Sequence, residues 1–216
     1  MDKLFIYGSG GLGRGVLNLL EDLNRIKKKW RIEGFLDDDK SIHGEFKNEK
    51  KVLGDVSYLL KEKERSAIVV AIASPVVKAK IVHKIKGLDH IYFPNIIHPS
   101  VSFSKYNEIG EGNIISSNAS ISTNVQVGNY SLIHYNCSIG HDVIINDYVA
   151  IYPNSSVGGY TEIKDGAIIG SNATILPEKI IGNECVVGAG AAVIHDLPEK
   201  CTAVGVPAKI IRRSLL

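Results

Sequence analysis

The chain has 216 residues and a formal net charge of +2 at pH 7, with 44% hydrophobic and 22% charged residues. This is the composition of an ordinary globular protein with one large or two modest domains, and its scattered charges give no indication of nucleic-acid binding. No apolar run approaches the roughly 20 residues that span a bilayer, and Met1 leads into a predicted strand rather than a signal peptide. We therefore expect a cytoplasmic protein with no membrane insertion.

The first stretch has the pattern of half a nucleotide-binding unit. Residues 2–7 read as a buried strand, the glycine-rich segment Gly8–Gly13 follows, and apolar residues at helical spacing continue to Leu23. Glycines at this point let backbone N–H groups approach a phosphate at the positive end of a helix. A tight turn that only packs helix on strand would need the same glycines, so the motif favours a nucleotide ligand without establishing one.

Two more strands complete a small Rossmann-like α/β domain over residues 1–90. Residues 32–36 form the second predicted strand, which ends in the acidic run Asp37 to Asp39, where such folds often bind a ribose. Residues 67–73 form the third strand, and a helix with Pro75 near its start is predicted from Val76 to Lys86. About 90 residues are too few for a dinucleotide domain with two mononucleotide halves. The sequence therefore favours a nucleotide sugar over NAD as the ligand.

A strict repeat of six residues organises the rest of the chain, which we assign to a second domain over residues 91–216. Residues 87–108 read as a connector, and the segment 95–99 is expected to enter the first partial coil. From Ile109 to Val193 every sixth residue is aliphatic, and such periodicity indicates repeated structural units. The fifteen positions are Ile109, Ile115, Ile121, Val127, Ile133, Ile139, Ile145, Ile151, Val157, Ile163, Ile169, Ile175, Ile181, Val187 and Val193.

Other positions of the six-residue step are also biased. Small side chains such as Ala119 stand two residues before the aliphatic, which implies a short strand with alternate side chains pointing inward. Glycines such as Gly140 follow the aliphatic and asparagines such as Asn118 come two residues later, where turns need permissive dihedral angles. Three such strands per coil close a triangular prism, and five coils at roughly 4.8 Å each make it about 24 Å tall. Lys179 falls in the small inward phase, where we expect a local distortion or a snorkelling side chain.

We predict no catalytic or metal-binding role for the end of the repeat or for the cysteines. The chain leaves the prism over residues 195–200, and a short basic tail follows Lys209. Cys137 and Cys185 occupy the inward phase and are interpreted as core residues, and the spacing of the three cysteines is not that of a metal site. We expect neither a disulfide nor a catalytic cysteine.

Two motifs carry a family resemblance that covers nearly the whole chain. The segment Gly205-Val206-Pro207-Ala208-Lys209 after the repeat, with Ile139-Gly140-His141-Asp142 in its middle coils, resembles the hexapeptide-repeat sugar acyltransferases of the sialic-acid O-acetyltransferase type. The chain is most similar to bacterial enzymes that N-acetylate a UDP- or dTDP-linked 4-amino-4,6-dideoxy sugar. The resemblance implies a left-handed parallel β-helix, although ordinary parallel crossovers are right-handed. It also implies a homotrimer that binds acetyl-CoA along the groove between neighbouring prisms.

The resemblance also assigns site residues. It implies His141 as the general base and Asp142 as its orienting partner, and a neutral imidazole suits this role because its unperturbed pKa is about 6.5. The expected acetyl-CoA contacts are Ala150, Gly159, Ser171 and Ala189, and the expected nucleotide-sugar contacts are Gly10, Gly11, Leu12, Asp37, Asp38 and Ala73. The relatives usually carry a second histidine where this chain has Ala150, which leaves the oxyanion contact open. A backbone N–H, such as that of Gly159, is an alternative donor, and His134 is a weaker one.

Three other functions remain open at this point. A sugar O-acetyltransferase would use the same fold and the same base. A metal hydratase similar to γ-type carbonic anhydrases would need His98 and His134, which share a phase two coils apart, together with His141. A trimeric scaffold without activity is the third, and the missing second histidine is its best support. We expect an acetyl-CoA-dependent enzyme that binds no metal.

Overall fold

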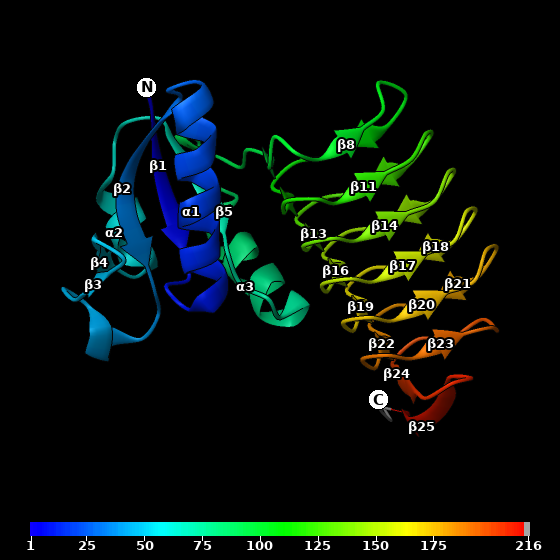
Figure 1. Cartoon of the computed structure of the whole chain (residues 1–216). Coiled ribbons are helices and arrows are strands. Elements are labelled where there is room, and N and C mark those ends of the chain that lie inside the picture. Colours follow the sequence, from blue (N-terminus) through cyan, green and yellow to red (C-terminus); the bar gives the residue numbers. More distant parts are fainter. Residues whose placement is uncertain (214–216) are drawn as a thin grey trace. The chain divides into compact units, whose positions relative to one another are not determined.

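The computed structural model describes residues 1–213 of the chain and divides into two compact units, Met1–Ile96 and a second unit from Ile97 onward. From the sequence, the division was placed between residues 90 and 91. Figure 1 shows a mixed α/β unit and a stack of short strands. Within the described residues, no helix is both long and apolar enough to cross a membrane.

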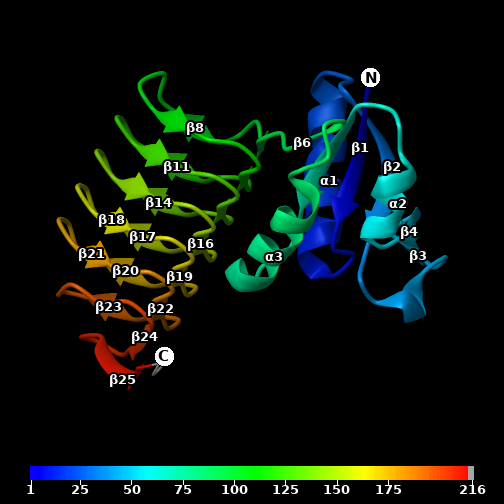
Figure 2. The same cartoon turned by 180° about the vertical axis from the view of Figure 1, so that it is seen from behind.

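The first unit is a six-stranded sheet with the order β3-β4-β2-β1-β5-β6. All neighbouring pairs are parallel except β3 and β4, which form an antiparallel hairpin. Helices α1 and α2 cover opposite faces of this sheet (Figures 1 and 2). The elements are β1 (Asp2–Tyr7), α1 (Gly11–Ile26), β2 (Trp30–Leu36), the 3-10 turn η1 (Lys40–Ile42), β3 (Phe46–Lys47), β4 (Lys50–Gly54), α2 (Val56–Lys61), β5 (Ser66–Val70), α3 (Pro75–Ile85) and β6 (Ile91–Tyr92).

Burial explains why these segments fold as they do. All five residues of β5 and the last four of β1 are buried, as expected for central parallel strands that are covered on both faces. Helix α1 buries the side chains of Val16, Leu17, Leu19 and Leu20, which recur at helical spacing. The predicted strand over 67–73 ends earlier, at Val70, and the residues after it form the loop before α3. The elements between residues 46 and 61 were not predicted.

The second unit is a triangular prism with a sheet on each of its three faces. Each strand from β7 to β23 has two residues, and neighbouring strands of a face are parallel and 18 residues apart, as Ile121 pairs with Ile139. We call the sheet from β7 to β25 the first face, that from β8 to β23 the second face, and that from β9 to β21 the third face. Figure 1 shows the strands of the second face stacked in order. This confirms the predicted β-helix, and the arrangement is consistent with the left-handed form.

The strands of the prism run from β7 to β23 without interruption. They are β7 (Ile96–Ile97), β8 (Ser102–Phe103), β9 (Glu108–Ile109), β10 (Ile114–Ile115), β11 (Ser120–Ile121), β12 (Gln126–Val127), β13 (Leu132–Ile133), β14 (Ser138–Ile139), β15 (Ile144–Ile145), β16 (Ala150–Ile151), β17 (Ser156–Val157), β18 (Glu162–Ile163), β19 (Ile168–Ile169), β20 (Thr174–Ile175), β21 (Ile180–Ile181), β22 (Val186–Val187) and β23 (Ala192–Val193). The segment 95–99 enters the first face as predicted. The prediction that residues 87–108 form only a connector is wrong in part, because β8 already belongs to the second face.

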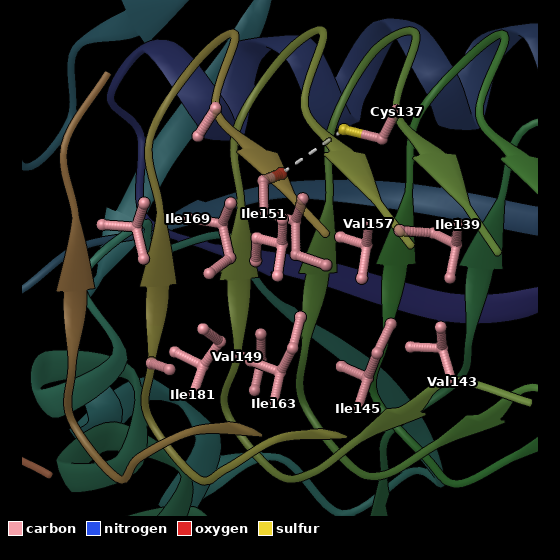
Figure 3. Close-up of a cluster of buried hydrophobic side chains, with 14 of the residues drawn as sticks. Cys137, Ile139, Val143, Ile145, Val149, Ile151, Val157, Ile163, Ile169 and Ile181 are labelled. Atoms are coloured by element: carbon pink, nitrogen blue, oxygen red, sulfur yellow. Dashed lines mark hydrogen bonds between the residues drawn. The ribbon is translucent and has the colours of Figure 1, made fainter. Parts of the chain in front are cut away.

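The core of the prism consists of the predicted aliphatic ladder. Fourteen of the fifteen aliphatic residues are at most 4% exposed, and Ile109, in the first coil, is partly buried. Figure 3 shows several of these side chains meeting inside the prism. Polar residues in the small inward phase are satisfied by backbone carbonyls, as when the Ser131 hydroxyl donates to Asn146 O at 2.9 Å. Lys179 turns outward, and its Nζ donates to Glu178 O at 3.2 Å, so the side chain snorkels.

The corners use asparagine and glycine for different reasons. Asn118, Asn124, Asn136, Asn154 and Asn172 all have φ between 56° and 62°, the left-handed region that asparagine tolerates. The glycines that follow the aliphatic residues do not need the left-handed region. They are required because a side chain would have no space there. A Cβ on Gly140 would lie 2.5 Å from Gly159 N of the next coil. The sequence-based explanation from dihedral freedom is therefore wrong for these glycines, which permit close stacking of the coils.

The C-terminal end of the prism is closed by a hairpin. Strand β24 (Cys201–Val204) adds to the first face beside β22, and β25 (Lys209–Arg213) returns antiparallel to it. Cys137 and Cys185 are buried as predicted, and all three cysteines are free thiols.

Candidate active site

His141 lies on the edge where the chain passes from the second face to the third, which we call the His141 edge. It follows β14 and precedes β15, and Thr123 and Gly159 take the same position in the coils before and after it. Because each coil repeats after 18 residues, side chains at this position form a column along the edge. The His141 side chain is 53% exposed. An imidazole placed here is accessible to a ligand.

The carboxylate of Asp142 orients the imidazole. His141 Nδ1 lies 2.8 Å from Asp142 Oδ2, and Asp142 Oδ1 accepts a hydrogen bond from Asn124 Nδ2 at 3.2 Å. The hydrogen bond to His141, and then that from Asn124, hold the pKa of the Asp142 carboxyl below its usual value. An ionised carboxylate only accepts, so the neutral imidazole carries its proton on Nδ1. This leaves Nε2 with a lone pair, as a general base requires.

The ring of His141 rests on a glycine and against a tyrosine. A Cβ on Gly159 would lie 2.9 Å from both Cε1 and Nε2 of His141, so only glycine leaves room for the ring. The Tyr160 ring meets the imidazole edge-on, with centroids 5.0 Å apart. Within residues 1–213 the Gly159 N–H donates no hydrogen bond. A backbone donor is therefore available next to the candidate base.

The residues predicted to contact acetyl-CoA lie on more than one part of the prism. Gly159 is on the His141 edge, whereas Ser171 and Ala189 occupy successive coils of the edge between the first and second faces, which we call the Ser171 edge. Ala150 is the first residue of β16 on the first face and is 2% exposed. One prism therefore does not bring these residues together. A groove between two copies would combine different edges, and this stays a prediction.

His134 is also on the Ser171 edge, away from His141. Its Nδ1 accepts a hydrogen bond from the Tyr135 N–H at 3.0 Å, and its ring lies against those of Tyr135 and Tyr152. Burial lowers the pKa of His134. Within one chain, His134 is not positioned to act together with His141.

In the first unit, the predicted glycine loop leads into an open helix N-terminus. Gly8, at φ +103°, and Gly13 are needed for packing, since a Cβ on Gly13 would lie 1.8 Å from Gly8 O. By contrast, a Cβ on Gly10 or Gly11 would meet nothing within 4 Å. Gly10 precedes α1 without a side-chain cap, and the first turn of α1 has no acidic residue. The positive end of this helix is thus open to an anion.

The two adjacent aspartates have different surroundings. Asp37 Oδ2 accepts from Ser9 N at 2.9 Å and Ser9 Oγ at 2.7 Å, and Oδ1 accepts from Asp39 N at 3.1 Å. Burial raises the pKa of Asp37, but these hydrogen bonds outweigh it and the net pKa is lowered. Asp37 thus holds the glycine loop in place. Asp38 Oδ1 accepts a hydrogen bond from the buried Tyr7 hydroxyl, and Asp38 Oδ2 lies 3.9 Å from Lys84 Nζ. The Asp38 side chain is more than half exposed.

The predicted nucleotide-sugar residues lie at one edge of the sheet. Strands β1, β2 and β5 are parallel neighbours, so the segments after them meet at their carboxyl ends. Leu12 lies in the first turn of α1 after β1, Asp38 follows β2, and the half-buried Ala73 lies in the loop after β5. Ligands of open α/β sheets bind at this edge.

Sequence reasoning missed three residues of these sites, namely Ser9, Asn124 and Tyr160. The positions of Asn124 and Tyr160 are one coil before and one coil after Asp142, so the repeat itself carried the signal. No group of three or more His, Cys, Asp or Glu side chains in the described part of the chain is arranged to hold a metal ion.

A small parallel α/β unit, a prism of six-residue repeats and a histidine–carboxylate pair on its edge define the class of two-domain hexapeptide-repeat acyltransferases. Comparison with known families agrees with this. Residues 3–85 match the model of the PglD N-terminal domain family. A search of curated proteins by sequence gives no match.

Solved structures are similar over nearly the whole chain. The H141N variant of perosamine N-acetyltransferase from Caulobacter crescentus, in complex with CoA and GDP-perosamine, is 27% identical with a TM-score of 0.88, and 97% of each chain is covered. WeeI from Acinetobacter baumannii AYE is 28% identical with a TM-score of 0.89 over 98% of this chain and 100% of that one. The acetyltransferase domain of PglB from Neisseria gonorrhoeae FA1090, in complex with acetyl coenzyme A, has the same fold at 24% identity, a TM-score of 0.87, and 97% and 99% coverage. These similarities confirm the resemblance to the sugar acyltransferases.

Proposed function

We propose that this protein transfers the acetyl group of acetyl-CoA to the 4-amino group of a nucleotide-linked amino-deoxy sugar, with His141 as the general base. The observation that carries the proposal is the His141–Asp142 pair on an exposed edge of the prism, with Nδ1 held at 2.8 Å from the carboxylate. The support from similarity is the 97% coverage of perosamine N-acetyltransferase, which is known in complex with CoA and GDP-perosamine.

The chemistry follows from the positions of the edge residues. His141 Nε2 accepts a proton from the sugar amine as the amine nitrogen bonds to the thioester carbonyl carbon. Asp142 stabilises the resulting imidazolium through Nδ1. The free N–H of Gly159 donates to the carbonyl oxygen, on which negative charge develops. His141 then returns the proton to the departing sulfur, and the products are an amide and CoA.

The first unit supplies the sugar-binding part of the proposal. Gly10, Gly11 and Leu12 form the open N-terminus of α1, whose backbone N–H groups suit the phosphates of a nucleotide. Asp38 and Ala73 lie at the same sheet edge and would contact the rest of the ligand. We assign Asp37 to the same site through its hydrogen bonds to the loop residue Ser9.

The proposal includes a cytoplasmic homotrimer. Ser171 and Ala189 are on a different edge from His141, so an acetyl-CoA molecule that contacts all three needs the edges of two copies. A groove between neighbouring prisms provides this arrangement, and the trimer closes three such grooves by symmetry.

The experiment that tests the proposal separates N- from O-transfer. Purified protein is incubated with acetyl-CoA and GDP-, UDP- or dTDP-linked 4-amino-4,6-dideoxy sugars, and CoA release is followed by thiol titration and mass spectrometry of the sugar. The matched controls are the same nucleotide sugars with a hydroxyl in place of the amine. An acetamido product with an amino sugar is the expected result. Transfer to the hydroxyl sugars alone would make the protein an O-acetyltransferase, and no transfer with any acceptor would favour a scaffold.

A further inference from the structure

A chain of polar side chains climbs the His141 edge over three successive coils. Ser104 Oγ donates to Thr123 Oγ1 at 3.5 Å, and Thr123 Oγ1 donates to Asn124 Oδ1 at 3.4 Å. Asn124 Nδ2 in turn donates to Asp142 Oδ1 at 3.2 Å, and Asp142 Oδ2 meets His141 Nδ1. The chain of contacts therefore ends at the candidate base.

We propose that Asn124 is a positioning residue of the acetyl-transfer reaction, which fixes the Asp142 carboxylate so that its second oxygen orients the His141 imidazole. The inference rests on the proposed function, in which His141 is the base. Asn124 does not touch the reacting atoms, and its effect on the reaction is exerted through Asp142.

Hydrogen bonds fix which end of the Asn124 side-chain amide faces Asp142. The Thr123 hydroxyl donates to the Asn124 amide oxygen, so the amide nitrogen is the atom that faces Asp142. The backbone gives the two corners a fixed register, because Asp142 N–H donates to Thr123 O at 3.0 Å. Asn124 and Asp142 have matching left-handed φ angles of 58° and 56°. A donor is thus held one coil away from the carboxylate oxygen that His141 does not use.

The need for such a donor follows from exposure. The Asp142 side chain is 31% exposed, and a carboxylate with only one anchored oxygen can rotate and let solvent take the place of the imidazole. A second hydrogen bond on the other oxygen sets the plane of the carboxylate. It also favours the ionised form, and the lowered pKa of Asp142 agrees with this.

The prism offers a matched control on another edge. Asn129 lies on the edge between the third and first faces, and its Nδ2 donates to Asp147 Oδ1 at 3.0 Å, an Asn–Asp hydrogen bond between successive coils like that of Asn124 with Asp142. A substitution at Asn129 therefore removes an equivalent inter-coil hydrogen bond that does not lead to His141. Any purely structural contribution of such bonds is measured at this position.

The first test removes the side chain without strain, since glycine tolerates the left-handed region. Asn124→Gly should lower kcat about 10-fold, a part of what a positioned base contributes, with KM for both substrates within about twofold. Asn129→Gly should leave kcat unchanged, and its melting temperature should fall at least as far as that of Asn124→Gly. Equal losses of kcat in both variants, or none in Asn124→Gly, would overturn the inference.

The second test uses the pH profile, which a merely structural role does not move. Asn124→Asp replaces the donor by a carboxylate, whose negative charge favours the protonated imidazole. The acidic limb of kcat/KM should move to higher pH by about half a unit, the size expected of one exposed charge at this range. Asn129→Asp should leave the limb in place, and an unmoved limb in Asn124→Asp contradicts the inference. Failure of the proposed function is distinguishable, because then the wild type would show no transfer to any amino sugar, or His141→Asn would keep the wild-type rate.

Discussion

At the scale of single residues, the candidate base depends on space as much as on hydrogen bonds. Asp142 and Asn124 orient the imidazole from one side, but the ring can occupy its place only because the next coil has a glycine beneath it. The Tyr160 ring, edge-on at 5.0 Å, limits the remaining movement. Small changes around His141 are therefore expected to affect the rate more than the stability.

Gly159→Ala tests this dependence on space. The added methyl group would lie 2.9 Å from His141 Cε1 and Nε2, so the ring must move away from its position over the coil. We expect kcat to fall about 10-fold or more, because misplacement by about 1 Å is costly in a positioned site. The measurement is steady-state kinetics alongside thermal unfolding. Gly87→Ala, where the Cβ meets nothing within 4 Å, is the control, and wild-type kcat in Gly159→Ala would contradict the account.

A pH-dependent contribution to stability is expected from Asp37. Hydrogen bonds from Ser9 and Asp39 lower its pKa in the folded state against the effect of burial. A carboxyl with a depressed folded pKa stabilises the protein above its unfolded pKa, near 4, and loses that contribution as the pH falls through the folded value. The difference in melting temperature between wild type and Asp37→Asn should therefore be large at pH 6 and shrink below about pH 4. The exposed Glu21→Gln is the control, and a constant difference across this range would count against the assignment.

At the scale of the elements, glycines set the stacking distance of the coils. A Cβ on Gly170 would lie 2.6 Å from Ala189 N, and this backbone belongs to the next coil and cannot simply turn away. Gly170→Ala should destabilise the protein by about 1–3 kcal/mol, the usual cost of overpacking. Denaturant unfolding measures this loss. Ser156→Ala, on the exposed second face, should change the stability little, and equal stabilities of the two variants would refute the close-contact explanation.

Elements with a periodic sequence were predicted, and short elements without a repeat were not. The six-residue ladder determined the prism, because each aliphatic position must point inward for the coil to close. The short elements β3, β4 and α2 have no comparable repeat, and they were missed. The third strand was predicted to reach residue 73 because the apolar run continues into the loop before α3. In the structure this strand, β5, ends at Val70.

The candidate site was predicted only in part, for a related reason. His141 and Asp142 are adjacent in sequence, so their pairing was readable. The contacts of Asn124 with Asp142 and of Gly159 with His141 join residues 18 positions apart. They follow from stacking the coils, and the exposure of each side chain had to come from the structure. The hydrogen bonds between Asp37 and Ser9 depend on how two loops meet, which a sequence pattern does not specify.

At the scale of the whole molecule, we expect the chains to assemble into a trimer. Three chains of 23.5 kDa give a particle of about 70 kDa, which light scattering after gel filtration measures. A monomer under active conditions would contradict the proposed groove between copies.

Mixing two inactive variants tests whether the edges of two copies form one site. His141→Asn removes the base, and Ala189→Trp blocks the Ser171 edge. If each site takes these edges from different chains, a one-to-one mixture should regain about a quarter of wild-type activity, because both partners of a site are intact in a quarter of random pairings. Each variant reassembled with itself is the control. Mixed trimers without activity would mean that both edges act within one chain, or not at all.

The role of His141 as the general base is tested by the rate at which His141→Asn transfers an acetyl group to a nucleotide-linked amino sugar. Asparagine keeps a polar side chain of similar size at the edge but cannot act as a base. The account predicts that kcat/KM falls at least about 100-fold, while calorimetric affinities for acetyl-CoA and the nucleotide sugar stay within about threefold of wild type. A variant that binds both ligands and retains wild-type turnover would show that His141 does not activate the amine.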